Sequence, residues 1–149
     1  MTQHHAPRTR LRTHSVFNQS EPLVDINLFN ADRILADAVS RNGGDVHSDR
    51  LSQFGALTGS AEVQEWGRQA NENPPRFKPF DRYGRRIDEV EFHPAYHQLM
   101  HAGLEAGVSA AAWHTDTAPH TLHSALLMLM GHADAGVCCP MSMTYACVP

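Results

Sequence analysis

The sequence predicts an all-α domain of about six helices, interrupted by one small charged hairpin or loop. Apolar residues recur at spacings of three and four, and capping or breaking residues stand at the ends of these periodic stretches. A chain of 149 residues is long enough for one domain with a sizeable core. Polarity falls along the chain, and residues 135–149 carry no charge. Such an apolar end needs a cover, so we expect the front part of a larger protein, truncated at its C-terminus.

Three helices are expected in the N-terminal half. Asn30 should cap the first helix (31–41), Ser48 the second, and Gly59-Ser60 should open the third, because such side chains accept hydrogen bonds from unpaired N–H groups at helix starts. The third helix should end at Asn73-Pro74-Pro75, since proline cannot continue a helix. Helical spacing assigns the following side chains to the inner faces: Ile34, Leu35, Ala38, Val39, Leu51, Phe54, Leu57, Val63, Trp66 and Ala70.

The character of the chain changes in residues 76–92. Asp81 and Gly84 stand where a type I turn prefers them, with apolar residues on both sides, so a hairpin or tight loop is expected. Two interpretations of its charges stay open: a solvated loop whose ion pairs contribute little, or a docking surface for an anion or a neighbouring subunit. The charged residues are Arg76, Lys78, Arg82, Arg85 and Arg86, followed by Asp88, Glu89 and Glu91.

Three further helices are expected in the C-terminal half. Pro94 and Pro119 suit the first position of two of them, and Pro140 suits the first turn of the last. Gly136 should end the helix that begins at Pro119. The expected inner faces hold Tyr96, Leu99, Met100, Leu104, Leu122, Ala125, Leu126, Leu129, Met130 and Ala133.

The residues alone do not define a catalytic, cofactor-binding or metal site. His93, His97 and His101 are four apart on a predicted helix, but no HExxH or Cys-His set accompanies them. Hydrogen-bonded or exposed histidines are therefore favoured over a metal site. A helix N-terminus lowers the pKa of a thiol, which makes Cys138-Cys139 a weak nucleophile candidate without a histidine partner at suitable spacing.

Charge and cysteine usage limit the class of protein. Residues 1–12 form a basic tail that we expect to be disordered, and the remainder has nine basic and sixteen acidic residues, a net charge of −7. That body gives no support for binding a phosphate backbone. The odd count of Cys138, Cys139 and Cys147 predicts reduced, buried thiols in a cytoplasmic protein. No stretch reaches the roughly 18 apolar residues of a membrane helix.

Several segments resemble the acyl-CoA dehydrogenase family, in particular its AidB type. They occur in order over residues 13–146, and together they are specific. The matching segments are Thr13-His14-Ser15-Val16-Phe17-Asn18-Gln19, Gln69-Ala70-Asn71-Glu72-Asn73-Pro74-Pro75, residues 81–97, Ala112-Trp113 and Cys139-Pro140-Met141-Ser142-Met143-Thr144. The resemblance implies that residues 13–149 are the N-terminal helical domain of a three-domain fold, here incomplete.

The same resemblance implies a function for the full-length protein. The family binds FAD and oxidises acyl-CoA thioesters between Cα and Cβ, with a carboxylate as base and the flavin accepting hydride. AidB-type members form homotetramers, carry a C-terminal DNA-binding region and are linked to the response to DNA alkylation. The flavin contacts, the base and the DNA-binding region correspond to sequence beyond Pro149, so no catalytic or FAD-binding residue is assigned. Met143 and Thr144 are candidates to line the acyl pocket; ordinary packing is the alternative.

An alternative function class is a non-catalytic module. The basic tail and the arginines of the 76–92 segment are the only support for an association with nucleic acid. A helical domain that docks a partner through its apolar C-terminus is a further possibility.

Overall fold

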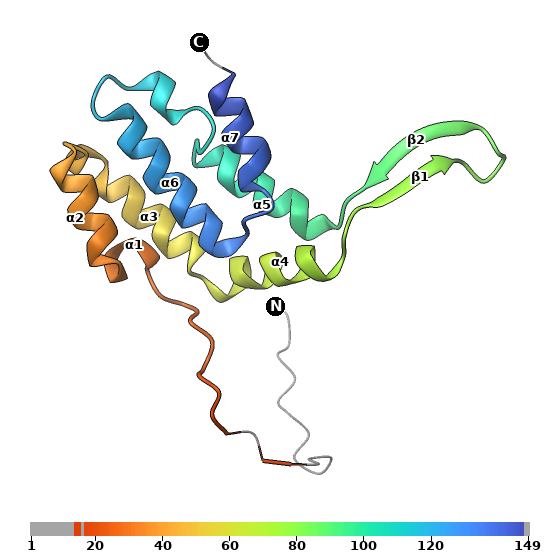
Figure 1. The fold of residues 1–149 in the computed structure, drawn as a ribbon, viewed down its shortest axis with the longest axis horizontal. Helices are drawn as coiled ribbons and strands as arrows, with labels where there is room; N and C mark the ends of the chain where they lie inside the picture. Colours follow the sequence, from red (N-terminus) through yellow and green to blue (C-terminus); the bar gives the residue numbers. More distant parts are fainter. Residues whose placement is uncertain (1–13, 16, 148–149) are drawn as a thin grey trace.

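The computed structural model describes residues 14, 15 and 17–147 of the chain (Figure 1). The all-α prediction is confirmed, with seven α-helices rather than about six among these residues. The elements are α1 (Leu28–Ala31), α2 (Arg33–Arg41), the 3-10 helix η2 (Asp45–His47), α3 (Ser48–Thr58), α4 (Ala61–Glu72), β1 (Arg76–Phe80), β2 (Arg86–Glu91), α5 (Pro94–Glu105), the 3-10 helix η3 (Ala111–His114), α6 (Pro119–Ala133) and α7 (Cys138–Ala146). The basic tail of residues 1–12 lies outside the described residues.

Helix α6 is the centre of the helical body. It contacts α2, α3, α4, η3 and α7, and therefore its buried side chains touch most of the other elements (Figure 1). Pro119 occupies its first turn as predicted. All six side chains expected on its inner face are buried: Leu122, Ala125, Leu126, Leu129, Met130 and Ala133.

The first predicted helix (31–41) corresponds to α2, which begins at Arg33 after the separate short helix α1, and the predicted cap is wrong. Asp32 interrupts the helical backbone, and its side chain accepts a hydrogen bond of 2.9 Å from the N–H of Leu35. Asn27 caps α1 in the same way, by accepting from the N–H of Asn30. Asp32 alone therefore separates α1 from α2, because its side chain competes for a backbone N–H group. Ser48 also caps nothing, because η2 leads directly into α3.

Three residues predicted to face inward lie outside. Ile34 is 81% exposed because Leu35 and Val39, four residues apart, define the buried stripe of α2. Leu57 and Leu104 are also largely exposed, at the ends of α3 and α5. Helix α6 ends at Ala133, three residues before the Gly136 stop that we expected.

The predicted hairpin is confirmed. The strands β1 and β2 are antiparallel, and Asp81 shapes the turn by accepting from the N–H groups of Tyr83 and Arg85 at 2.8 and 2.9 Å. Gly84 has φ 80°, a conformation that favours glycine. The hairpin extends away from the helical body, and both of its strands are exposed (Figure 1).

None of the helices in the described part of the chain has the length and apolar character needed to cross a membrane.

Candidate functional site

Asp134 connects α4, α6 and α7. It is buried directly after α6, where its Oδ2 accepts a 3.0 Å hydrogen bond from the N–H of Val137 at the start of α7. Its Oδ1 accepts a 2.9 Å bond from the side-chain amide of Asn71 on α4. Val137 and Met141 of α7 are fully buried beside this junction. Helix α7 is therefore held by one carboxylate and two apolar side chains, which fixes the direction of its outer face.

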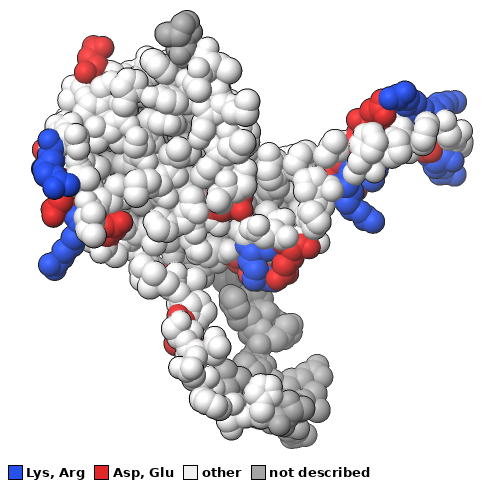
Figure 2. All heavy atoms as spheres, in the orientation of Figure 1, with Lys and Arg blue, Asp and Glu red and all other residues white. Residues whose placement is uncertain are grey.

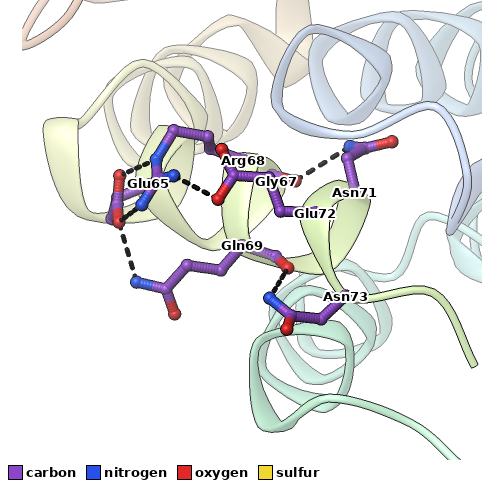
Figure 3. A network of polar contacts seen from close by, with 7 residues as sticks. All are labelled: Glu65, Gly67, Arg68, Gln69, Asn71, Glu72 and Asn73. Atoms are coloured by element: carbon purple, nitrogen blue, oxygen red, sulfur yellow. Dashed lines mark hydrogen bonds and ion pairs between the residues drawn. The ribbon is translucent and has the colours of Figure 1, made fainter.

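The Asn71 contact explains the segment 69–75. Asn71 also donates to the carbonyl of Gly67 at 2.8 Å, and Asn73 donates to the carbonyl of Gln69 at 2.8 Å, which completes the end of α4 (Figure 3). Arg68 forms hydrogen-bonded ion pairs with Glu65 and Glu72 on the same helix, and these raise the pKa of the guanidinium. The segment thus terminates α4 and positions α7.

The outer face of α7 is exposed and uncharged. Met143 is 64% exposed, and Thr144 beside it is exposed as well. The Thr144 hydroxyl donates to the carbonyl of Pro140 at 2.9 Å, so its hydrogen is already used within the helix. These two predicted site residues therefore present a thioether, a methyl group and, as their one polar atom, a hydroxyl oxygen that can only accept hydrogen bonds. This surface suits an apolar ligand.

An aromatic cluster borders this face, and the sequence analysis did not identify it. The rings of His123 and Tyr145 are stacked with centroids 3.6 Å apart, and Trp113 stacks on Tyr145 at 5.2 Å. The Tyr145 hydroxyl lies 2.5 Å from Nδ1 of His120, in a hydrogen bond. His123 is buried and donates from Nδ1 to the carbonyl of Val108. The sequence signal for this cluster was limited to the spacing of His120 and His123, which lie one turn apart on the helix that was predicted to begin at Pro119.

The histidines of α5 do not form a metal site. His93 caps the helix by accepting from the N–H of Ala95, and His97 packs against the rings of Phe92 and Tyr96. His101 lies 3.6 Å from Glu105 on the exposed surface. Within residues 14, 15 and 17–147 no three His, Cys, Asp or Glu side chains are grouped closely enough to hold a metal ion.

The cysteines differ from the prediction in one respect. All three lie within the described residues and are free thiols, but only Cys138 is partly buried, whereas Cys139 and Cys147 are exposed. Burial and the negative charge of Asp134 raise the pKa of the Cys138 thiol. This direction is opposite to the thiolate that a helix N-terminus favours, so the structure contradicts an activated Cys138.

We expect Cys138 to react with iodoacetamide several-fold more slowly than Cys139 or Cys147 near neutral pH, because the thiolate is the reactive form and burial limits access. Timed labelling followed by peptide mass spectrometry measures the three rates. The difference should narrow as the pH rises, because Cys138 then ionises, and it should vanish in denaturant. Equal rates in the folded protein would contradict the geometry of the Asp134 junction.

Residues 92–149, which include α7, do not fit a dinucleotide cofactor. Binding a diphosphate calls for cationic side chains or a glycine-rich loop at a helix N-terminus. Residues 92–149 contain no Lys or Arg, and Gly43-Gly44 has neither phosphate-binding pattern. The apolar face of α7 therefore suits a hydrocarbon group, and no chemical step through a flavin is assigned to this chain.

Two solved structures share the fold of this chain. The fold is similar to the apo form of Bd2924, with a TM-score of 0.69 and 25% identity over 80% of this chain and 25% of that chain. It is also similar to ACDH-11 of Caenorhabditis elegans, solved in complex with C11-CoA, with a TM-score of 0.70 and 24% identity over 94% of this chain and 25% of that chain. The helical body and its projecting hairpin thus share the fold of about a quarter of each of these longer proteins.

The sequence comparisons identify the particular family. A family model of the adaptive response protein AidB N-terminal domain matches residues 18–149. The Escherichia coli (strain K12) protein named "Putative acyl-CoA dehydrogenase AidB" is 43% identical over 140 residues, which are 93% of this chain and 26% of that protein. Acyl-CoA dehydrogenase family member 11 of C. elegans is 32% identical over 97 residues, 63% of this chain and 16% of that protein. The chain belongs to the AidB N-terminal domain family and spans about a quarter of AidB.

Proposed function

We propose that this chain is the N-terminal helical part of an FAD-dependent acyl-CoA dehydrogenase of the AidB type, in which the outer face of α7 forms one wall of the acyl pocket. The observation that carries the proposal is the exposed, uncharged face of Met143 and Thr144, which Asp134 holds in place. Apolar side chains with few polar groups are typical of small-molecule pockets. The other walls, the FAD and the base would come from outside this chain.

The charge distribution supports the assignment of the acyl-pocket wall to this chain and of the FAD and the base to parts outside it. Residues 92–149 hold three acids and no Lys or Arg, so this part of the chain suits the acyl group of an acyl-CoA rather than its phosphates. The structure of ACDH-11 with C11-CoA is a precedent for an acyl-CoA ligand in a relative with this fold. A homotetramer, contact with DNA, a role in the alkylation response and a cytoplasmic location are further proposals that follow from the resemblance to AidB.

A nucleic-acid module is less well supported. The described helical part, residues 17–75 and 92–147, holds four Arg and twelve Asp or Glu, a net charge of −8, which repels a phosphate backbone. The hairpin, residues 76–91, carries five Lys or Arg and four Asp or Glu, a net charge of only +1, although basic side chains gather at its free end (Figure 2).

The purified protein tests the proposal through its visible absorption spectrum and intact mass. A mass above 16.5 kDa with flavin bands that bleach on addition of an acyl-CoA without oxygen supports it. Flavin bands without bleaching would retain the family relationship and remove the dehydrogenase reaction. A mass of 16.5 kDa without flavin would contradict an enzymatic role for this chain.

Changing Met143 tests the pocket wall. We expect Met143→Trp to raise KM for long-chain acyl-CoA at least tenfold, because the larger ring occupies space meant for the acyl chain. The matched control is Met128→Trp on α6, since Met128 is 51% exposed compared with 64% for Met143. Steady-state rates over a series of acyl lengths measure the effect. Equal behaviour of the two variants would mean that Met143 is an ordinary surface residue.

A further inference from the structure

A hollow of about 250 Å³ lies at the base of the hairpin. It is formed where the end of α4 leads into β1 and where β2 leads into α5, which are the two connections between the hairpin and the helical body (Figure 1). Asn73 and Pro74 line it on the first connection, and Phe92, His93 and Pro94 line it on the second. None of these residues belongs to α7, so this hairpin-base hollow is separate from the proposed wall of the acyl pocket.

His93 has a hydrogen-bond donor without a partner. Its Nδ1 accepts a 3.3 Å hydrogen bond from the N–H of Ala95, so Nδ1 carries no hydrogen. The hydrogen of the neutral ring therefore lies on Nε2, which has no hydrogen-bond partner among the described residues. The N–H groups at the start of α5 are already used, because Ala95 donates to the His93 ring and Tyr96 donates to the His93 carbonyl oxygen. The donors that a ligand would meet here thus belong to side chains.

Arg76 and Asn73 add further donors to the hairpin-base hollow. Arg76 is the first residue of β1, and its guanidinium forms no ion pair or hydrogen bond within residues 14, 15 and 17–147. A guanidinium carries five N–H donors in a planar fork that fits the oxygens of a phosphate or carboxylate. The side-chain amide of Asn73 uses one N–H for the carbonyl of Gln69 (Figure 3) and keeps the other.

One acid lines the same hollow, and its charge is already offset. Glu91 is the cross-strand partner of Arg76, but its carboxylate forms an ion pair of 2.8 Å with Lys78. The hydrogen bond from Lys78 is the main cause that lowers the pKa of Glu91, and the charge of Arg76 contributes least. Arg76 and Lys78 against Glu91 leave a net charge of +1 around the hollow, which favours an anion.

The remaining lining is apolar and held in place. Proline fixes its own φ, so Pro74 and Pro94 are rigid walls. The ring of Phe92 is stacked on that of Tyr96, with centroids 4.4 Å apart. The volume is many times the ~15 Å³ that one water molecule needs, so an organic group has room beside an anion.

We propose that the hairpin-base hollow binds a small phosphate monoester, with Arg76 and His93 donating to the phosphate oxygens and the organic group against the prolines and Phe92. A phosphate fits better than a carboxylate, because the donors come from three separate segments and a phosphate monoester has three terminal oxygens.

Bound phosphate would also have a structural effect. The donors stand on both connections of the hairpin, so one ligand would tie the two connections together and restrict the movement of the hairpin relative to the helical body.

Two arginines of the hairpin provide a matched test with phenyl phosphate as the probe. Isothermal titration of the purified protein should show saturable binding with a Kd of about 1 mM or lower. Arg76→Gln should weaken it about tenfold, since hydrogen bonds to a charged group are lost. Arg82→Gln removes the same charge from the exposed turn, outside the hollow, and should change the Kd by less than about twofold. His93→Ser keeps a capping oxygen for α5 and should weaken binding about fivefold.

Comparison ligands and hydrogen exchange complete the test. Benzoate and inorganic phosphate should each bind about threefold more weakly than phenyl phosphate, because one lacks the third oxygen and the other lacks the ring. Phenyl phosphate should slow amide exchange in residues 76–91 of the wild type but not of Arg76→Gln. No saturable binding, equal effects of the two arginine variants, or equal affinity for either comparison ligand would each overturn the proposal. None of these readouts depends on flavin or acyl-CoA, so their failure is distinguishable from failure of the proposed function.

Discussion

Replacing Gly67 with alanine is expected to destabilise the fold by about 3 kcal/mol, at the upper end of the usual cost of overpacking. A Cβ added to Gly67 would lie 2.1 Å from the carbonyl oxygen of Ala133, where α4 crosses the end of α6. The obstacle is backbone, which cannot rotate away as a side chain can. The two helices would have to separate next to Asp134, so the damage should reach α7.

A second glycine provides the control. Gly131 lies on the exposed side of α6, and the nearest atom to an added Cβ is Sγ of Cys138 at 3.9 Å. Gly131→Ala should therefore stabilise the protein by about 0.5–1 kcal/mol through helix propensity alone. Urea unfolding with an unchanged denaturant slope measures both effects. A Gly67→Ala variant as stable as wild type would show that α4 and α6 are less closely packed than described.

The elements that the sequence predicts correctly depend on local information. The inner face of α6 is visible as apolar residues at spacings of three and four behind Pro119, and all of those side chains are buried. Ser60 caps α4 as expected, because its side chain accepts from the N–H of Val63, three residues away. Pattern and cap agree at these positions, so no long-range contact is needed to locate the helix.

The errors have a physical cause in competition between local signals. Asn27, Asn30 and Asp32 are all good caps, and only the three-dimensional backbone shows that Asn27 and Asp32 are used. Ile34 matches helical spacing as well as Leu35 does, yet it is exposed because the neighbouring helices lie on the other side of α2. Periodicity alone does not determine how a helix is rotated about its axis, so the predicted buried stripe can be shifted by about one residue.

The site was predictable only in part. The resemblance selected Met143 and Thr144, and the structure places both on the exposed side of α7, where their role in the pocket stays a prediction. Asp134 appeared in the sequence as one of two isolated acids after Glu105. Its partner Asn71 is 63 residues away, and no local pattern reports that contact. The register shift between Lys78 and Phe80 in the hairpin could not be predicted from the sequence either, since it depends on how the two strands pair.

Replacing Asp134 with alanine should cost about 3 kcal/mol of unfolding free energy, because hydrogen bonds to a charged group contribute about 1.5–3 kcal/mol each and two are lost. The N–H of Val137 would lose its acceptor in a buried place, and the exposed Asn71 would lose one of its two hydrogen bonds. Asp134→Asn keeps one acceptor oxygen and should lie between alanine and wild type. Asp116→Ala is the control, since Asp116 is exposed and distant from this junction in the sequence.

Asp134→Ala should also change the alkylation rate of Cys138 in the folded protein, an effect that a general loss of stability would not produce. Cys138 begins α7 and is shielded by burial beside Asp134, so Asp134→Ala should speed its alkylation under conditions where the protein stays folded. Removal of the negative charge acts in the same direction, because it lowers the pKa of the thiol. Asn71→Ala should have a smaller effect on the alkylation of Cys138. In the double variant with Asp134→Ala, it should lower the unfolding free energy by less than it does alone, since the two residues share one hydrogen bond. Strict additivity would mean that the helices α4 and α7 are held independently, and the outer face of α7 would then owe its position to Val137 and Met141 alone.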